Sequence, residues 1–140
     1  QCFNAMKIYE KADILKDIIN DRDMTFYIQL IDSKKIIGAV FINNDHLRYQ
    51  VNSVCLSYYL AKEYCGQGYM SEALNVVIDY LFDQGKEVIS ARAFVGNEPS
   101  KRLLLKLGFV LEGCLRKAVK GYQGIIYDDL VFSLIKDNDC

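Results

Sequence analysis

The sequence predicts a single α/β domain built on a mixed sheet. Segments in which apolar and polar residues alternate, or which are rich in β-branched residues, are interspersed with segments in which apolar residues recur at helical spacing. Their order is a helix, antiparallel strands, a strand–helix–strand–helix unit and further strands, which is typical of a mixed sheet. With 140 residues, one proline and no repeat or low-complexity run, the chain shows no domain boundary, so we expect residues 1–140 to form one domain.

The first part of the chain is predicted to form a helix followed by strands. Apolar residues from Ile8 to Ile19 recur at helical spacing and predict an amphipathic helix over Lys7–Asn20. Alternating and β-branched residues predict the strands that follow, and polar residues predict the turns between them. We expect strands over 24–31, Ile36–Ile42 and 54–60, with turns at Asp32–Lys35 and Asn43–His46.

The second part contains two further predicted helices, each followed by a strand. An apolar stripe predicts that the first of them begins at about Tyr69 and stops at Gly85. The second begins at Asn97 or Glu98, has the only proline of the chain in its first turn, and ends at Gly108. We expect strands over Val88–Val95, Phe109–Leu115 and Ile125–Ile135, the last two joined by a turn at Gly121–Gly124.

Charge and hydropathy exclude several classes of protein. An apolar share of 51% with 25% charged residues is typical of a globular domain and excludes a disordered tail or a coiled coil. A net charge of −1 does not fit a basic nucleic-acid-binding surface, so we expect no nucleic-acid partner. The longest apolar runs are too short to span a membrane, and we expect no membrane partner.

The cysteines and the single histidine limit the kinds of disulfide, catalytic and metal site that the chain can form. Five cysteines form an odd set without a C-x-x-C pair, which does not fit an extracellular disulfide framework and predicts reduced thiols in the cytoplasm. The only histidine, His46, lies in a predicted polar turn, where we expect it to fill the turn rather than to catalyse. Without a histidine and thiol cluster, we expect no metal site.

A glycine turn before a helix is the main chemical signal. Gly66 and Gly68 let the backbone turn tightly, and the N–H groups at the start of the following helix favour a phosphate. A P-loop would need Lys and Ser or Thr after the second glycine, where this chain has Tyr69 and Met70. A dinucleotide site would need a third glycine in place of Ser71 and an acid after the next strand, which is absent. Taken alone, the turn is also compatible with a tight loop that binds nothing.

Further motifs occur in order with this turn. The first runs from Tyr58-Tyr59-Leu60 to Ala73-Leu74, the second from Asn97-x-x-Ser100 to Leu107-Gly108-Phe109, and the third is Glu112-Gly113-x-Leu115-Arg116; the tail follows with Gly121–Asp128 and Leu130–Leu134. With these motifs the sequence resembles the GNAT superfamily of acetyl-CoA-dependent N-acetyltransferases. It is most similar to the Rim-type branch, which includes ribosomal-protein-alanine and spermidine acetyltransferases. The resemblance covers roughly residues 36–135.

The resemblance implies a GNAT-like fold, a mixed, mostly antiparallel sheet with a central splay, flanked by helices. Rim-type enzymes open with a strand and a helix before the element predicted over Lys7–Asn20. We therefore expect an acetyltransferase domain that is truncated at its N-terminus, or one whose missing edge strand comes from a partner chain. Dimers are frequent in this branch, so a homodimer is one expected assembly.

The resemblance also assigns the cofactor, acetyl-CoA, with CoA as product. Its pyrophosphate would lie on the backbone N–H groups of Gly66, Gln67, Gly68, Tyr69, Met70 and Ser71. Its pantetheine arm would run along the strand that ends at Leu60, with Asn97 hydrogen-bonding it from the other side. Lys101 or Arg102 would reach the adenosine phosphate; the alternative for both is an ordinary solvated helix face.

In this family a neutral amine attacks the thioester directly. A backbone N–H near Leu60 would polarise the thioester carbonyl, and Ser100 would protonate the departing thiolate. The alternative for Ser100 is to satisfy backbone groups in the first turn of its helix. Many members have a tyrosine where Leu104 stands, and Tyr122 and Tyr127 are further candidates for the acid.

The base and the acceptor are left open. Rim-type enzymes often carry a glutamate where this chain has Cys55, so the base comes from Glu63, another acid or the substrate, or is absent. The expected acceptor is a primary amine: a protein N-terminus, a polyamine or another small amine. The alternative function is a GNAT-like module that binds CoA without transferring an acetyl group.

Overall fold

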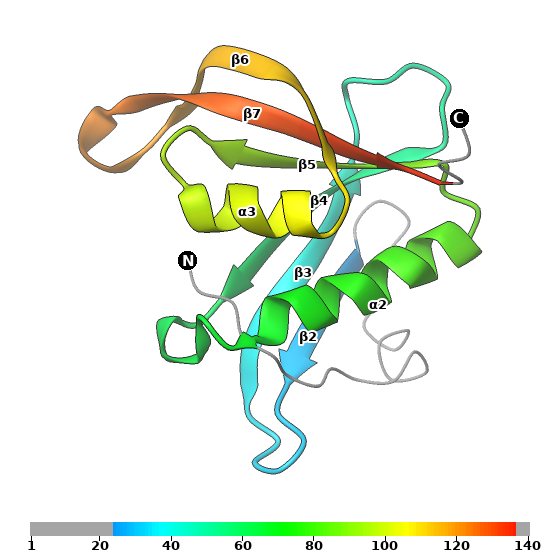
Figure 1. Cartoon of the computed structure of the whole chain (residues 1–140), viewed down its shortest axis with the longest axis vertical. Coiled ribbons are helices and arrows are strands. Elements are labelled where there is room, and N and C mark those ends of the chain that lie inside the picture. Colours follow the sequence, from blue (N-terminus) through cyan, green and yellow to red (C-terminus); the bar gives the residue numbers. More distant parts are fainter. Residues whose placement is uncertain (1–23, 137–140) are drawn as a thin grey trace.

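The computed structural model describes residues 24–136, which form a six-stranded sheet and two α-helices (Figure 1). The helix predicted over Lys7–Asn20 lies outside the described residues. The elements, in order, are β2 (Met24–Gln29), β3 (Ile36–Asn44), β4 (Ser53–Leu60), the 3₁₀ turn η1 (Lys62–Tyr64), α2 (Tyr69–Asp83), β5 (Val88–Phe94), α3 (Glu98–Lys106), β6 (Val110–Lys120), the 3₁₀ turn η2 (Tyr122–Gly124) and β7 (Ile126–Ile135).

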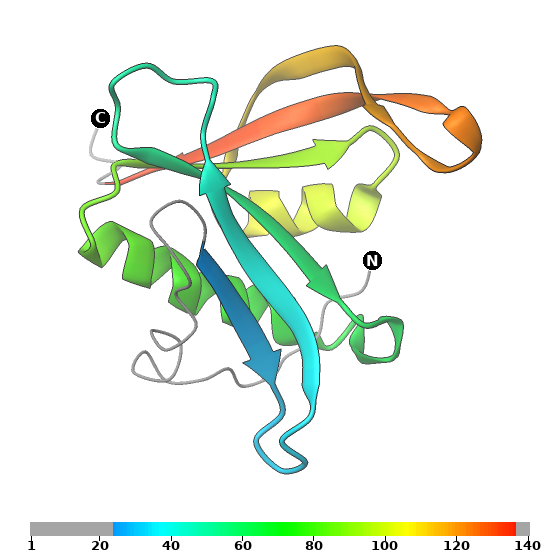
Figure 2. The ribbon, with the colours of Figure 1, turned by 180° about the vertical axis from the view of Figure 1, so that it is seen from behind.

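The sheet is mixed, with the strand order β2-β3-β4-β5-β7-β6. Only β4 and β5 pair in parallel, and their register runs from Ser53 opposite Val88 to Leu56 opposite Ala91. Beyond this point β4 stays paired with β3 as far as Leu60, while β5 stays paired with β7. The two neighbours therefore diverge and open a splay, as the view from behind shows (Figure 2). The predicted mixed, mostly antiparallel sheet with a central splay is confirmed.

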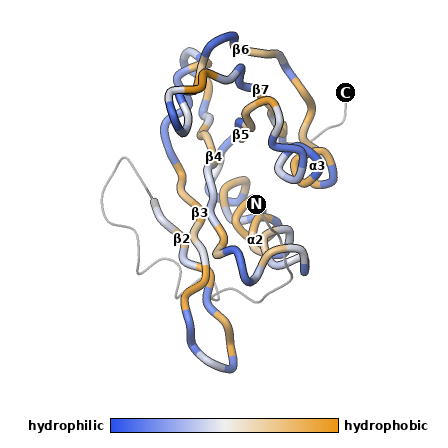
Figure 3. Tube along the Cα trace, turned by 90° about the vertical axis from the view of Figure 1, so that its left-hand side faces the viewer, coloured by the Kyte–Doolittle hydropathy of each residue, from blue (hydrophilic) through white to orange (hydrophobic). Residues whose placement is uncertain are grey.

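Both helices lie on the same face of the sheet (Figure 3). Apolar residues of α2 and α3 pack there against alternate residues of the strands, because successive side chains of a strand point to opposite faces. Burying one such Leu, Ile or Phe side chain contributes roughly 1.5–3 kcal/mol. The fully buried residues of this core include Phe26, Ile28, Val40, Ile42, Met70, Leu74, Val77, Leu81, Ile89, Leu104 and Phe132.

Most predicted boundaries agree with the structure, because they rest on local backbone chemistry. Gly85 and Gly108 follow the helices with φ of +95° and +98°, a conformation that glycine adopts without strain. The predicted turn at Asn43–His46 is wrong by two residues, since Asn43 and Asn44 extend β3 opposite Cys55 and Val54. The strand predicted to end at Leu115 continues to Lys120, because its hairpin with β7 extends that far.

Gly38 on β3 lies close against the backbone of β4. A Cβ atom added there would lie 2.4 Å from the carbonyl oxygen of Tyr59 and 3.0 Å from Leu60 Cδ1. We expect Gly38→Ala to lower the free energy of unfolding by about 1–3 kcal/mol, because strand backbone must shift to make room. Gly113→Ala is the matched control: it is also in a strand, and nothing lies within 4 Å of its added Cβ. Equal stability of the two variants in urea unfolding would contradict the prediction.

Candidate functional site

The splay exposes backbone groups on the inner edge of β4. The N–H of Ala61 donates to the carbonyl of Ile37 at 2.8 Å, so Ala61 faces β3. Because successive residues of a strand direct their N–H and C=O groups to opposite sides, those of Leu60 and Tyr58 face the splay. No strand occupies that side among the described residues, since the β4–β5 ladder ends at Leu56. A strand edge beyond the end of its ladder is a place where an extended ligand can add as a further strand.

The parallel pairing of β4 and β5 brings two helix N-termini to the mouth of the splay. Helix α2 follows the C-terminal end of β4, and α3 follows the C-terminal end of β5. Because the two strands run in the same direction, both helices begin at the same edge of the sheet and on the same face (Figure 1). Each N-terminus presents unpaired N–H groups and a partial positive charge, which favours an anion.

The turn before α2 has the geometry that the glycines predict. Gly66 and Gly68 have φ of +80° and +85°, and Gly68 is the N-cap residue without a side chain to cap the helix. The first N–H groups of α2 therefore have no side-chain cap. Nothing lies within 4 Å of a Cβ added at Gly66, so the turn is open on that side.

The predicted pyrophosphate residues form one continuous segment here. Tyr69, Met70 and Ser71 make up the first turn of α2, directly after Gly66, Gln67 and Gly68. The side chain of Met70 is fully buried in the core, so only its backbone is available to a ligand. The structure brings the six residues together; their role in binding stays a prediction.

Across the splay, the start of α3 carries Asn97 and Ser100. The Asn97 side chain accepts a hydrogen bond from the N–H of Ser100 at 3.4 Å and so caps the helix. The Ser100 hydroxyl is 2.5 Å from the phenol oxygen of Tyr58 on β4. Ser100 is 3% exposed, and burial raises the pKa of Tyr58 although the hydrogen bond with Ser100 opposes this. On α3, Lys101 is half-buried and Arg102 is exposed.

The other residues considered for proton transfer lie in different surroundings. Leu104 is fully buried in the core, and Glu63 is exposed on η1. Cys55 lies half-buried on the face opposite the helices, where burial raises the pKa of its thiol and the charges of two carboxylates add to this. Tyr122 is 83% exposed on the hairpin, whereas Tyr127 packs against Phe94 with ring centroids 5.2 Å apart.

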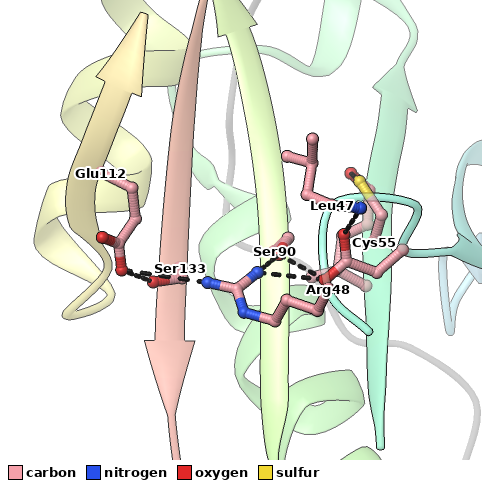
Figure 4. A network of polar contacts seen from close by, with 8 residues as sticks. Leu47, Arg48, Cys55, Ser90, Glu112 and Ser133 are labelled. Carbon is pink, nitrogen blue, oxygen red and sulfur yellow. Dashed lines mark hydrogen bonds and ion pairs between the residues drawn. The ribbon is translucent and has the colours of Figure 1, made fainter. Parts of the chain in front are cut away.

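A polar network on the face of Cys55 has no counterpart in the sequence prediction (Figure 4). Arg48, in the loop before β4, donates to Ser90 at 2.6 Å and to Asp45 at 3.0 Å, and Ser90 donates to Asp45 at 3.1 Å. On the neighbouring strands Ser133 donates to Glu112 at 2.5 Å, and Arg48 lies 3.9 Å from the same carboxylate. The network therefore ties the loop before β4 to β5, β7 and β6.

Next to this network, Arg92 on β5 donates from Nε to the buried carboxylate of Asp129 on β7. No short motif could have revealed either group, because the partners lie between 3 and 64 positions apart. The only available signal is serine and aspartate within otherwise apolar strands. Buried polar residues of that kind need partners, which here come from neighbouring strands and the loop.

The described cysteines do not all follow the prediction. Cys55 and Cys114 are free thiols, whereas Cys65 is disulfide-bonded. The prediction of reduced thiols throughout is therefore wrong for Cys65, because a cysteine count contains no information on the distances between sulfur atoms. Within residues 24–136, no group of His, Cys, Asp and Glu side chains could hold a metal ion, and no helix is long and apolar enough to cross a membrane.

Comparisons with known proteins agree with this geometry. A family model described as "Acetyltransferase (GNAT) domain" matches residues 4–110. The uncharacterised N-acetyltransferase YoaA of Bacillus subtilis (strain 168) is 34% identical over 123 residues, which make up 84% of this chain and 66% of that protein.

Solved structures are similar as well. The ribosomal-protein-S5-alanine acetyltransferase from Vibrio fischeri has a TM-score of 0.76 at 34% identity, with 83% of this chain and 63% of that chain covered. The microcin C7 self-immunity acetyltransferase MccE, solved in complex with acetyl-CoA and AMP, has a TM-score of 0.73 at 27% identity, with 89% and 67% covered. The chain thus spans less than two thirds of the length of the Bacillus and Vibrio proteins.

The Asp45 carboxylate gives the polar network a measurable pH dependence. Burial acts to raise its pKa, but hydrogen bonds from the Leu47 N–H, Arg48, Ser53 and Ser90 outweigh this and hold the pKa below its ordinary value. A lowered pKa in the folded state means stability that is present above about pH 4 and is lost as the pH falls through the folded value.

We expect Asp45→Asn to lower the free energy of unfolding at pH 7 by about 1–3 kcal/mol, because hydrogen bonds to a charged group are lost. The difference from the wild type should shrink below about pH 4. Asp32→Asn, in the exposed turn after β2, is the control and should have no effect. Urea unfolding at a series of pH values measures this, and a difference that is constant down to about pH 2.5 would contradict the prediction.

Proposed function

Since this chain belongs to the GNAT family of acetyltransferases, we propose that it transfers an acetyl group from acetyl-CoA to a primary amine. The observation that carries the proposal is the splay, where the pairing of β4 with β5 ends at Leu56 and two helix N-termini lie at the mouth. An extended polar chain ending in phosphates fits this arrangement, because the chain can pair with the strand edge and the phosphates can accept from helix N–H groups. The related MccE is solved with acetyl-CoA, which supports this cofactor.

In the proposed complex, the N–H groups from Gly66 to Ser71 bind the pyrophosphate. The edge of β4 up to Leu60 binds the pantetheine arm, and Asn97 approaches the arm from α3. The Asn97 side-chain oxygen accepts from the Ser100 N–H, which holds Asn97 at the start of α3, and Asn97 is the residue of this wall that we assign to the arm. Lys101 and Arg102, on the face of α3 toward solvent, are the cations that we assign to the adenosine phosphate.

The proposed chemistry is direct attack by the amine on the thioester carbon. The N–H of Leu60 faces the splay and stabilises the oxygen that gains charge as the carbon becomes tetrahedral. As the C–S bond breaks, Ser100 donates a proton to the thiolate and CoA leaves as the thiol. The amine nitrogen gives up its proton to solvent, either directly or through an acidic residue.

We assign no base to a side chain of the described residues. The thiol of Cys55 has a raised pKa and is therefore a poor proton acceptor at neutral pH. Glu63 is exposed and lies on η1, directly after β4. It remains a candidate, together with the substrate itself.

The acceptor follows from the geometry only in part. The cofactor residues lie on the face of α2 and α3, so the amine approaches from the opposite face, where Cys55 lies. A protein N-terminus, a polyamine and another small amine are all acceptors that fit this proposal. The proposal also includes a homodimeric assembly and a cytoplasmic location. The names of relatives support the first two: one is a ribosomal-protein-alanine acetyltransferase and another a spermidine acetyltransferase.

A second candidate is a module that binds CoA without transferring the acetyl group. It is favoured by Cys55 and by the buried Leu104, which stand at two proton-transfer positions of the family. CoA release with a panel of N-terminal peptides, polyamines and amino sugars separates the two. Tight cofactor binding without turnover on any amine would favour the module.

The first prediction of the proposed function is binding of acetyl-CoA. We expect calorimetry to detect binding by the wild type and Gly66→Ala to weaken it by roughly tenfold, or about 1.4 kcal/mol, because the methyl group enters the anion-binding turn. Gly124→Ala is the matched control: φ there is +76°, nothing lies within 4 Å of the added Cβ, and the position is in the β6–β7 hairpin. Absence of binding at about 1 mM acetyl-CoA would contradict the proposed function.

The second prediction concerns Ser100. We expect Ser100→Ala to lower kcat by roughly 100-fold, the usual range for loss of a general acid, while the Kd for acetyl-CoA changes by less than about threefold. Steady-state kinetics and calorimetry on the same preparation measure both quantities. Equal losses in kcat and affinity would instead assign Ser100 to cofactor binding.

A further inference from the structure

The contact between Tyr58 and Ser100 joins the two walls of the splay. Tyr58 lies on β4, two residues before Leu60 and on the same face, whereas Ser100 lies in the first turn of α3. Their oxygen atoms are 2.5 Å apart, which is at the short end for a hydrogen bond between hydroxyl groups. Ser100 is almost completely buried, so the pair is held by its surroundings as well as by the bond.

A serine hydroxyl alone is a weak proton donor for a thiolate. A thiol such as that of cysteine has a pKa of about 8.5 and a phenol one of about 10, whereas an aliphatic hydroxyl ionises far above both. Proton transfer is efficient when the donor and acceptor have similar pKa values. Ser100 can therefore supply a proton to the thiolate only if its own oxygen is reprotonated in the same step.

Helix α3 offers no phenol for this task. Its sequence, Glu98–Lys106, contains no tyrosine, and Leu104 is part of the core. The phenol of Tyr58 reaches the Ser100 hydroxyl from the opposite wall instead. Burial raises the pKa of Tyr58, so the phenol is protonated at neutral pH and has a proton to give.

We propose that Tyr58 is the proton source behind Ser100 in the acetyl-transfer reaction, an inference that rests on the proposed function. As the C–S bond of acetyl-CoA breaks, the sulfur takes the proton of the Ser100 hydroxyl and the Ser100 oxygen takes the phenol proton of Tyr58. The phenolate regains a proton from solvent. The amine nitrogen has released one proton to solvent or to a base, so the protons balance and CoA leaves as a neutral thiol.

A purely structural tie between β4 and α3 would explain the same contact, so the test has to separate rate from stability. Tyr58→Phe removes one oxygen atom and keeps the ring in the core. Tyr59→Phe is the matched control: it lies on the same strand, points to the opposite face and is 61% exposed. Single-turnover acetyl transfer, the Kd for acetyl-CoA and the thermal midpoint are measured for both variants and the wild type.

We expect Tyr58→Phe to lower the single-turnover rate by roughly 10- to 100-fold, with the Kd for acetyl-CoA within about threefold of the wild type. The double variant with Ser100→Ala should be no slower than the slower single variant, because the two hydroxyl groups act as a unit. The wild type should also show a solvent deuterium isotope effect on this rate that Tyr58→Phe lacks. Tyr59→Phe should match the wild type in every measurement.

The outcomes are distinguishable. A wild type that transfers acetyl groups while Tyr58→Phe keeps its rate and isotope effect would overturn the relay and leave the proposed function standing. The relay would also be overturned if the rate losses of Tyr58→Phe and Ser100→Ala multiplied in the double variant. The same holds if Tyr58→Phe lost affinity for acetyl-CoA and thermal stability together with its rate. A wild type that binds acetyl-CoA and acetylates no amine would overturn the proposed function and the relay together.

Discussion

The early end of the β4–β5 ladder is the constraint from which the candidate site follows. Backbone N–H and C=O groups need hydrogen-bond partners, and a sheet normally supplies them from both neighbouring strands. Here β5 supplies them only as far as Leu56, and beyond that point the backbone groups of β4 that point away from β3 face the splay. The proposed cofactor takes the place of the missing strand.

The same parallel pairing also explains where charge can be bound. Because β4 and β5 run in one direction, the two helices that follow them begin at one edge, and their partial positive charges add there. The chain has a net charge of −1, so no general excess of cations directs an anion to this edge. The helix ends provide a local preference that composition cannot reveal, and the glycine turn keeps one of them open.

The sequence was sufficient to predict features that depend on neighbouring residues. The strands, the starts of α2 and α3 and the glycines after them follow from periodicity and capping, and the structure agrees with them. The grouping of Gly66–Ser71 with Asn97 and Ser100 was implied by the resemblance to the GNAT superfamily. Contacts between distant residues could not be predicted in this way. Tyr58 and Ser100 are 42 positions apart, and the network of Arg48 joins a loop to three strands. Such contacts depend on register, which one sequence without a structure does not specify.

The short seam between β4 and β5 also has a mechanical consequence. Four register pairs join one half of the sheet, β2-β3-β4, to the other half, β5-β7-β6. The Arg48 network crosses this seam on the face away from the helices, and the Tyr58–Ser100 bond crosses the gap on the helical face. The two halves of the sheet therefore resemble two plates joined by a hinge. The Arg48 network holds them together at the closed end of the splay, and the Tyr58–Ser100 bond holds them together near its mouth. The Arg48 network lies away from the mouth, so changes in this network can alter how easily the mouth opens without altering any residue that lines it.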